Sequence, residues 1–168
     1  LTGAALAEGV DIGEINKRRR AISAIKGGGL LTSFKGQKVD VLAISDVAGD
    51  SISVIGSGIG APPERIGFAY NCGVVAANAV ARDAVVEIAK SLDIKIISNK
   101  ENLYEDVPII AARIAQEIKE GPDGLYVYGG EPTVILPENP GKGGRNQALA
   151  LEIARHVQTR TDIIGLVA

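Results

Sequence analysis

Two short stretches towards the end of the sequence place charged side chains directly after glycine pairs. Glu131 follows one Gly-Gly pair, and Arg145 and Asn146 follow another, within GGEPTVILPENPGKGGRNQALALEIA (129–154). Glycine pairs let a backbone approach a ligand closely. A helix that begins at Arg145 would aim its free amide groups and a forked guanidinium at one anion. The pattern favours a site for a carboxylate or a transferring phosphoryl group.

A simpler interpretation of the same residues needs no ligand. The second glycine pair would be a flexible loop, and Asn146 would cap the helix that follows it. An arginine is unfavourable at the positive end of a helix dipole, which weakens this interpretation. Glu131, on the other side of the loop, is expected either to hold Arg145 in place or to ligate a metal.

The loop SDVAGD (45–50) carries two further carboxylates, Asp46 and Asp50, at the end of a predicted strand. Such a pair could bind Mg²⁺, or one of them could accept the proton of a hydroxyl. The two aspartates could equally cap the turn through hydrogen bonds to their own backbone. The residues alone leave both interpretations open.

Lys26 stands at the end of a predicted helix (12–26), which Asp11 would cap, and three consecutive glycines follow it. The helix dipole favours a cation there by up to about 1 kcal/mol. A structural role therefore explains Lys26 at least as well as contact with a ligand.

The stretch GSGIGA (56–61) matches the G-x-G-x-x-A pattern of dinucleotide-binding loops. That pattern needs a helix starting at once, so that its N-terminus faces a pyrophosphate. Two prolines and a predicted strand follow here instead, which leaves no room for the helix. The sequence also lacks a Walker loop, because GKGGRN has neither the upstream glycine spacing nor the hydroxyl residue after lysine.

Strands and helices alternate from residue 66 onward. This predicts an α/β fold with a mostly parallel sheet and helices on both faces, in which ligands gather at the carboxyl ends of the strands. Helices are expected at 12–26, 73–92, 107–120 and 146–158, and strands at 39–45, 51–56, 65–70, 94–98, 124–130, 132–136 and 162–168.

The segment between Ser57 and Arg65 raises a topological problem. It would join two predicted strands without a crossover helix, although a parallel pair needs about a dozen residues for one. Either a segment is missing here or the two strands are antiparallel.

The composition excludes several classes of protein. With 46% hydrophobic and 23% charged residues, it is typical of a soluble globular protein. A net charge of -2 argues against a nucleic-acid binder, and no apolar run approaches the roughly 20 residues that span a membrane. Cys72, the one cysteine, suits the cytoplasm and is expected in the core. The one histidine, His156, is expected on the outer side of its helix.

Three stretches together carry a family resemblance. EINKRRRAISAIKGG, LAISDVAGDSISVIGSG and GGEPTVILPENPGKGGRNQALALEIA occur in this order. They are similar to the glycerate 2-kinases, the family whose C-terminal half is called MOFRL. The resemblance runs through most of the chain, and the block from GGE to GGRNQ is its most specific part.

The resemblance implies ATP-dependent phosphorylation of D-glycerate to 2-phosphoglycerate with Mg²⁺. It implies an enzyme of two α/β domains with the active site between them, and the single cysteine makes the cytoplasm the expected location. The expected partners are D-glycerate and ATP. Neither a nucleic acid nor a membrane is expected as a partner, and whether the protein forms a homodimer is left open. Two alternatives remain: an NAD(P)H-dependent hydroxypyruvate reductase, a name this family has also carried, and a non-catalytic module that binds small anions.

The resemblance also assigns roles to residues. Arg145 is similar to the arginine that acts on the substrate and the transferring phosphate, and Asp46 and Glu131 match acidic active-site positions. The carboxylate pair of the SDVAGD loop, Asp46 and Asp50, supplies the expected metal ligands. The residues expected to bind substrate or nucleotide are Lys26, Ser57, Asn71, Gly144 and Asn146.

The sequence also departs from the family pattern. The family continues the Ser-Gly of residues 57–58 with Pro-Thr and a helical segment, whereas Ile-Gly follows here. The family's catalytic lysine, its Gly-rich phosphate loop and its TDG loop have no counterpart. We therefore expect residues 1–65 to be an incomplete N-terminal glycerate kinase domain. Residues 66–168 would be an α/β portion leading into a truncated MOFRL-like region, and these residues alone would not catalyse.

Overall fold

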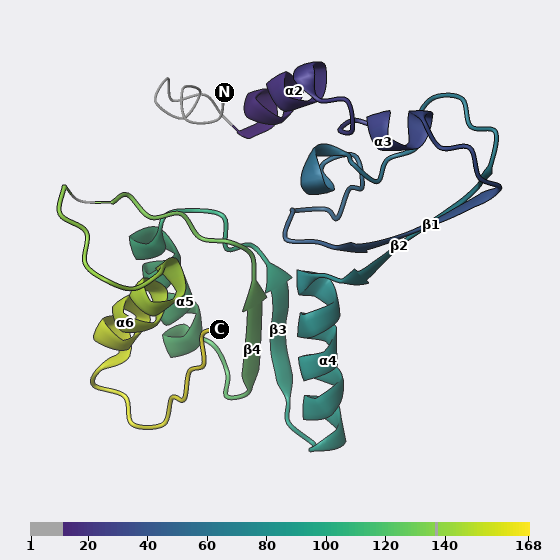
Figure 1. Ribbon diagram of the computed structural model, residues 1–168. Coiled ribbons are helices and arrows are strands. Elements are labelled where there is room, and N and C mark those ends of the chain that lie inside the picture. Colours follow the sequence, from purple (N-terminus) through teal and green to yellow (C-terminus); the bar gives the residue numbers. More distant parts are fainter. Residues whose placement is uncertain (1–11, 137) are drawn as a thin grey trace. The chain divides into compact units, whose positions relative to one another are not determined.

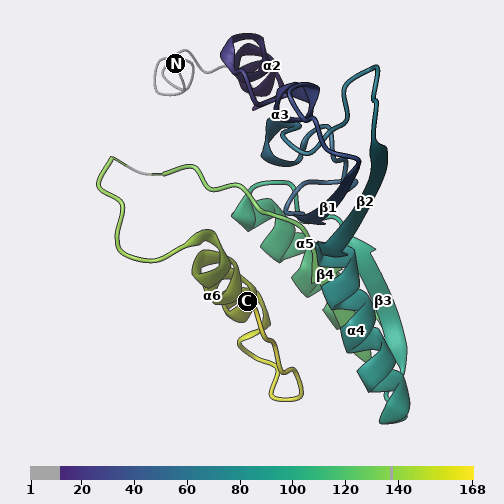
Figure 2. The ribbon, with the colours of Figure 1, turned by 45° about the vertical axis from the view of Figure 1, so that its right-hand side comes forward.

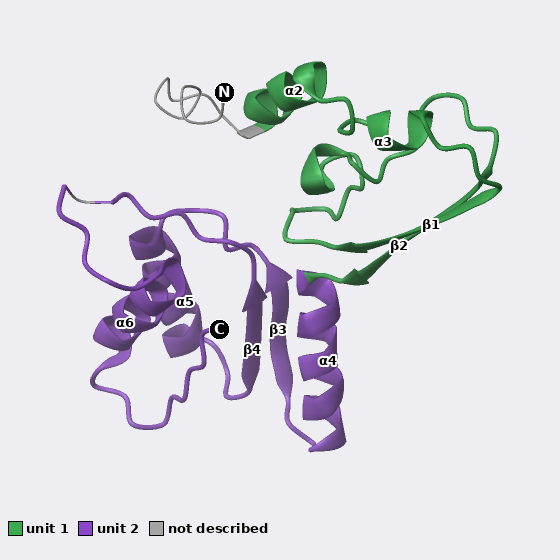
Figure 3. Ribbon diagram, in the orientation of Figure 1, with its two compact units in different colours: residues 1–77 green, residues 78–168 purple. Residues whose placement is uncertain are grey.

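The computed structural model describes residues 12–136 and 138–168. The chain forms two compact units, which divide between Ala77 and Asn78 (Figure 3). The expected helix cap at Asp11 lies outside the described residues. The expected domain boundary between residues 65 and 66 stays a prediction.

Unit 1 is built around one pair of parallel strands. Its helices are α2 (Ile12–Ile22), the single turn α3 (Gly29–Thr32) and the 3₁₀ turn η1 (Ile55–Ser57). Its strands are β1 (Lys38–Ile44) and β2 (Ala69–Ala76). They run parallel, from Lys38 opposite Ala69 to Ile44 opposite Ala76, with one irregularity before Ile44 (Figure 1).

Unit 2 contains a second pair of parallel strands among three helices. The elements are α4 (Asn78–Ser91), β3 (Ile96–Glu101), α5 (Val107–Glu120), β4 (Leu125–Gly129) and α6 (Arg145–Val157). β3 and β4 run parallel, so their carboxyl ends meet at one edge, where Glu101 lies opposite Gly129.

Side chains alternate between the two faces of β3, as the pleat of a strand requires. Arg82 of α4 donates hydrogen bonds to Asn99 and Glu101, whereas Lys100 donates to Glu117 of α5 at 2.6 Å. Figures 1 and 2 show α4 on one side of the β3–β4 pair and α5 on the other. The expectation of parallel strands with helices on both faces is therefore confirmed for this unit.

The core of unit 2 lies where α5 packs against α6. Apolar residues recur along α5 at helical spacing, which gives the helix one buried face. Leu149 of α6 packs against that face, and Tyr128 of β4 borders it. The buried members of this cluster are Leu103, Val107, Ile110, Ala111, Ile114 and Leu149.

The helix expected at 107–120 is confirmed at both ends, and those expected at 12–26 and 146–158 are confirmed with shifted bounds. α2 stops at Ile22, four residues earlier than expected. The hydroxyl of Ser23 accepts hydrogen bonds from the amides of Ile25 and Lys26, both at 3.4 Å, and so turns the chain out of the helix.

Three expected strands are wrong. Residues 51–56 form turns that lead into η1, where Gly56, Ser57 and Gly58 all have positive φ. Residues 132–136 contribute a single bridge, between Thr133 and Asp106, and residues 163–168 are irregular. β-branched side chains at these places suited a strand, but no strand in the described part of the chain pairs with them.

The strand expected at 65–70 and the helix expected at 73–92 are displaced. β2 runs from Ala69 to Ala76, so residues 73–76 are strand, and α4 begins only at Asn78. Residues 73–76 are strand and not helix because they continue the parallel pairing of β2 with β1.

The connection from β1 to β2 spans residues 45–68 and contains η1 but no α-helix. The antiparallel alternative is wrong, since residues 51–56 are not a strand and β1 and β2 are parallel.

Candidate active site

Arg145 is the first residue of α6, and Gly144 is its N-cap, with an extended backbone (φ -143, ψ 172). Among the described residues, no side-chain hydrogen bond caps this helix. The interpretation that Asn146 is the cap is therefore wrong. Instead, Asn146 Nδ2 donates to the backbone oxygen of Ala168 at 2.8 Å. The amide groups of the first turn are thus left to a solvent molecule or an anion.

The structure brings Arg145 and Glu131 together. An Nη of Arg145 lies 2.7 Å from a carboxylate oxygen of Glu131, and it also approaches the carbonyl oxygen of Pro132 at 3.4 Å. The two side chains remain 48% and 54% exposed. An exposed pair of this kind stabilises a fold by about 1 kcal/mol at most. The contact orients the guanidinium and leaves its outer edge open to a ligand.

Two glycines before Glu131 fix the course of the backbone. Gly130 has φ 132, where a side chain is strained. Gly129 has a close neighbour, since a Cβ built on it would lie 2.6 Å from Cγ of Asn78 and 2.8 Å from Cδ of Arg82. The Gly129 carbonyl accepts two amide hydrogen bonds, from residues 102 and 103, both at 3.0 Å.

This close approach gives a first prediction. Gly129→Ala is expected to lower the free energy of unfolding by about 1 to 3 kcal/mol, because the new methyl group overlaps Asn78. Combining it with Asn78→Ala removes the nearer of the two neighbours and leaves only the flexible side chain of Arg82, so the two effects should be non-additive by about 1 kcal/mol or more. Urea unfolding of the two single variants and the double variant measures this coupling. Additive losses would show that the two residues do not meet.

The acidic loop of unit 1 presents its carboxylates differently. Asp46 is exposed, and Asp50 is half-buried with φ 51. The turn is closed by Ser45, whose hydroxyl accepts a hydrogen bond from the amide of Val47 at 3.3 Å. Within residues 12–136 and 138–168, neither aspartate side chain has a hydrogen bond that would make it a turn cap.

Carboxylates on one loop fit Mg²⁺, which is held by one or two protein carboxylates together with waters and substrate phosphates. No group of three or more Asp, Glu, His or Cys side chains that could hold a metal occurs among the residues the structure describes. Asp46 and Asp50 could therefore contribute one or two ligands but not a complete protein cage.

Lys26 and Ser57 both make contacts within unit 1. Lys26 lies in the turn after α2, beyond the helix, and its Nζ donates to the carbonyl oxygen of Gly56 at 2.9 Å. The dipole of α2 therefore does not explain why a lysine stands at position 26. Ser57 is buried, and its hydroxyl donates to Oδ1 of Asn16 at 2.9 Å. The glycine turn of residues 27–29 is held against η1 by its own amides, since Gly27 donates to the carbonyl oxygen of Ser57 at 3.1 Å and Gly28 to that of Gly58 at 2.9 Å.

Asn71 lies inside β2, whereas the sequence placed it after a strand. Its Nδ2 donates to Oδ1 of Asp40 on β1 at 2.9 Å. This bond and the ammonium group of Lys38 hold the pKa of Asp40 below its ordinary value. The neighbouring Cys72 is exposed, so its expected place in the core is wrong.

The stretch GSGIGA is not a dinucleotide-binding loop. Its first two glycines belong to η1 and to the turn that follows, and residues 58–68 contain no helix that could face a pyrophosphate. The prediction that this motif lacks its helix is confirmed.

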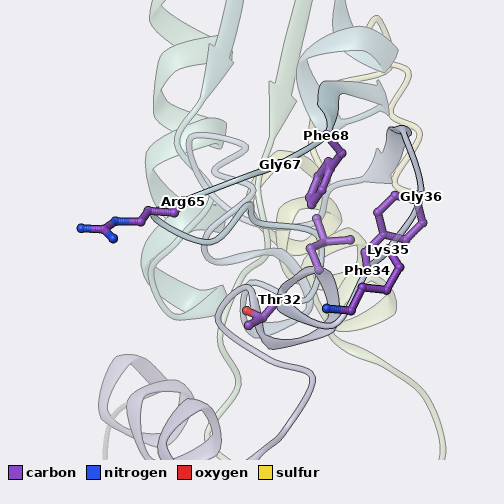
Figure 4. A pocket seen from close by; sticks show the side chains of 8 residues that line it. Thr32, Phe34, Lys35, Gly36, Arg65, Gly67 and Phe68 are labelled. Atoms are coloured by element: carbon purple, nitrogen blue, oxygen red, sulfur yellow. The ribbon is translucent and has the colours of Figure 1, made fainter.

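Unit 1 also has an open hollow of about 270 Å³ (Figure 4). Phe34 and Phe68 meet edge to face in its wall, with ring centroids 5.2 Å apart. Figure 4 shows the side chain of Arg65 extending away from the two rings. The lining residues are Leu31, Thr32, Phe34, Lys35, Gly36, Arg65, Gly67 and Phe68. None of the expected site residues is among them.

Sequence reasoning missed the polar cluster of Arg82, Asn78, Asn99 and Glu101 beside Gly129. Its only signal in the sequence was the spacing of Asn78 and Arg82, four residues apart on one side of a helix. That spacing is common on solvated helices, so it did not indicate a site.

Comparisons with known proteins identify the family. Residues 1–93 match the family described as "Domain of unknown function (DUF4147)", and residues 124–168 match the MOFRL family. In the described residues, no helix has the length and apolar character needed to cross a membrane.

Similar proteins of known name cover most of the chain. A glycerate 2-kinase of Pyrococcus horikoshii is 30% identical over 200 residues, which include 90% of this chain and 45% of that protein. A protein of Agrobacterium vitis, provisionally named hydroxypyruvate reductase, is 30% identical over 194 residues, with 90% of this chain and 50% of that protein covered. The crystal structure of a glycerate kinase from Thermotoga maritima has a TM-score of 0.79 and 26% identity, over 93% of this chain and 47% of that one.

The chain spans about half the length of the curated relatives it matches. The alignment of 200 residues is longer than the chain itself, so the relative has internal residues with no counterpart here. A missing segment between Ser57 and Arg65 stays a prediction.

The DUF4147 match covers more than half of the chain, the MOFRL match follows it in sequence, and most of the fold superposes on a glycerate kinase. The chain therefore belongs to the DUF4147–MOFRL family, to which its sequence motifs pointed.

Proposed function

We propose that this chain takes part in the phosphorylation of D-glycerate by ATP, with 2-phosphoglycerate as the product. One observation carries the proposal: Arg145 stands at an uncapped helix N-terminus and is oriented by Glu131 at 2.7 Å. The names of the relatives from Pyrococcus horikoshii and Thermotoga maritima support the choice of substrate.

In the proposed reaction, the guanidinium of Arg145 and the first-turn amides of α6 bind the carboxylate of glycerate. A planar fork with several donors suits a carboxylate or a phosphoryl group better than an ammonium does. The 2-hydroxyl attacks the γ-phosphorus of ATP in line, the bond to the β,γ-bridging oxygen breaks, and ADP leaves. Positioning and neutralisation of charge supply the catalysis.

Acidic residues have two tasks in this proposal. Asp46 and Asp50 would hold Mg²⁺, which neutralises charge on the ATP phosphates when bound. Glu131 orients Arg145, and either Glu131 or Asp46 accepts the proton of the attacking hydroxyl.

Lys26, Ser57, Asn71, Gly144 and Asn146 complete the proposal as residues that bind substrate or nucleotide. The support differs among them. Gly144 caps α6 beside Arg145 and is open to a ligand, whereas Lys26, Ser57 and Asn71 already have partners within unit 1.

The decisive experiment uses the full-length protein. It is incubated with D-glycerate, ATP and Mg²⁺, and the products are followed by ³¹P NMR. We expect ADP and the resonance of 2-phosphoglycerate. Formation of the 3-phosphate would refute the position of attack, and no ADP despite glycerate binding would indicate a non-catalytic anion-binding module.

A parallel reaction with NADH and hydroxypyruvate tests the reductase. One relative carries that name, but the faulty GSGIGA motif argues against it. Loss of nicotinamide absorbance would favour the reductase, and we expect none.

A glycine substitution tests whether substrate approaches the start of α6. A Cβ added at Gly144 meets no atom within 4 Å, so Gly144→Ala should leave the fold unchanged. If glycerate contacts this backbone, the methyl group should crowd it by about 1 to 3 kcal/mol, which corresponds to a rise in KM of about fivefold to a hundredfold. Gly141→Ala is the matched control, because Gly141 lies in the same loop and is equally open. Equal KM values for the two variants would remove Gly144 from the site.

A further inference from the structure

Arg82 of α4 is a largely enclosed cation that the proposed reaction does not use. Its side chain is only 13% exposed. Nε donates to Asn78 Oδ1 at 2.8 Å, one Nη donates to Asn99 Oδ1, and the other meets Glu101 Oε2 at 2.9 Å. The guanidinium thus links α4 to Asn99 and Glu101, two side chains on the same face of β3.

The partners of Arg82 are themselves held by other side chains. Glu101 also accepts a hydrogen bond from the hydroxyl of Tyr104, and Asn99 Nδ2 donates to Asp83 Oδ1 at 2.9 Å. Hydrogen bonds from Tyr104 and then Arg82 hold the pKa of Glu101 below its ordinary value. Glu101 therefore stays ionised opposite Arg82, and the additional hydrogen bonds fix the positions of Glu101 and Asn99.

This cluster lies against the end of β4. Gly129 is opposite Glu101 in the parallel register, and its α-carbon has no room for a methyl group beside Asn78 and Arg82. Its carbonyl oxygen accepts hydrogen bonds from the amides of Asn102 and Leu103, at 3.0 Å each.

Glu131, the residue that contacts Arg145, follows Gly129 by only two residues. A Cβ at Gly130 would lie 2.8 Å from both N and O of Leu103, so this residue too is tightly enclosed. Glu131 follows at once and contacts Arg145 at 2.7 Å. The direction of the Glu131 carboxylate therefore depends on where the end of β4 is held.

We propose that Arg82 is a positioning residue, which fixes the Gly129–Glu131 backbone and so aims Glu131 at Arg145. This inference rests on the proposed role of Arg145 in binding glycerate. A merely structural role for Arg82 would instead lower overall stability without a specific effect on this backbone.

The chain offers a matched control. Lys100 pairs with Glu117 at 2.6 Å, on the same strand as Glu101 but on the opposite face. Lys100→Met removes an ion pair between β3 and a helix without touching the cluster around Gly129. Arg82→Met removes the cluster, and Arg82→Lys keeps a charge opposite Glu101 but cannot reach Asn78 and Asn99 in the same way.

Hydrogen exchange of the full-length protein provides a readout that does not depend on activity. The reporters are the amides of Asn102 and Leu103, which bond to Gly129, and that of Thr133, which bonds to Glu105. Relative to the amides of α5, we expect Arg82→Met to accelerate exchange at these reporters roughly tenfold or more, and Arg82→Lys to lie between it and wild type. Lys100→Met should change them less than threefold. Equal acceleration in Arg82→Met and Lys100→Met would overturn the proposal, and if Arg82→Met does not fold, Arg82→Lys against Lys100→Met decides.

Glycerate affinity then separates this inference from the proposed function. We expect the dissociation constant of D-glycerate to rise about tenfold in Arg82→Met, and the effects of Arg82→Met and Glu131→Gln to be less than additive, since both act through Arg145. Fully additive effects would contradict the inference. Loss of glycerate binding in the wild-type protein would refute the proposed function, while the exchange result would still test the positioning of the backbone.

Discussion

Replacing Arg145 by alanine should lower kcat/KM for D-glycerate about a thousandfold in the full-length protein. Loss of the guanidinium should weaken glycerate binding about tenfold, and a 2-hydroxyl that is no longer held in line with the γ-phosphorus can cost roughly a further 10² in rate. The fold should be almost unaffected, because the pair with Glu131 is half-exposed and worth about 1 kcal/mol at most. A coupled assay of ADP formation gives the rate, and thermal unfolding gives the stability.

Arg155→Ala is the control for this prediction. Arg155 lies on the same helix, is 72% exposed and pairs with Glu152 at 3.3 Å. Its removal eliminates one surface cation of α6 without touching the helix start, so activity should stay within about twofold of wild type. Arg145→Lys should recover only part of the lost rate, since an ammonium cannot form the two parallel bonds of the fork. Near-wild-type activity of Arg145→Ala would remove this residue from the mechanism.

Replacing Ile110 by alanine should have the largest effect on stability. Ile110 is fully buried (0% exposed) in the cluster between α5 and α6. Its truncation removes apolar contacts and leaves a cavity, and such changes cost about 2 to 5 kcal/mol. We expect the urea midpoint, followed by circular dichroism, to fall accordingly, with the loss seen in unit 2.

The neighbouring residue supplies a matched control. Ile109 belongs to the same helix and has the same side chain, but it is 55% exposed. Ile109→Ala should therefore change the free energy of unfolding by about 0.5 kcal/mol or less. Equal losses in the two variants would mean that the buried face of α5 has been misassigned.

The elements that the sequence predicted well have local causes. α5 has apolar residues at helical spacing, Pro108 in its first turn and Gly121 directly after its last residue. These signals depend on no other part of the chain, so both ends were predicted. β4 lies within the predicted strand because it is short, apolar and bounded by glycines.

The elements that were predicted badly depend on contacts between distant residues. Residues 73–76 read as the start of a helix, yet they are strand because they pair with β1. Residues 51–56 read as a strand, but positive φ at Gly56 breaks the extended conformation, and none of the strands that the structure describes pairs with them. Periodicity cannot report such pairing, since it describes one segment at a time.

The candidate site shows the same division. The contact between Glu131 and Arg145 was expected as one of two options, because the two glycine pairs marked both ends of one loop. The cluster around Arg82 was not expected. It joins residues from α4 and the end of β3, and only the folded unit shows that they enclose Gly129.

The central claim is that Arg145, oriented by Glu131 at the start of α6, binds the carboxylate of glycerate. Isothermal titration of D-glycerate into the wild-type protein and into Arg145→Ala tests it most directly. The account predicts binding by the wild type and a dissociation constant at least about tenfold higher in the variant. Equal dissociation constants for the two proteins would contradict it.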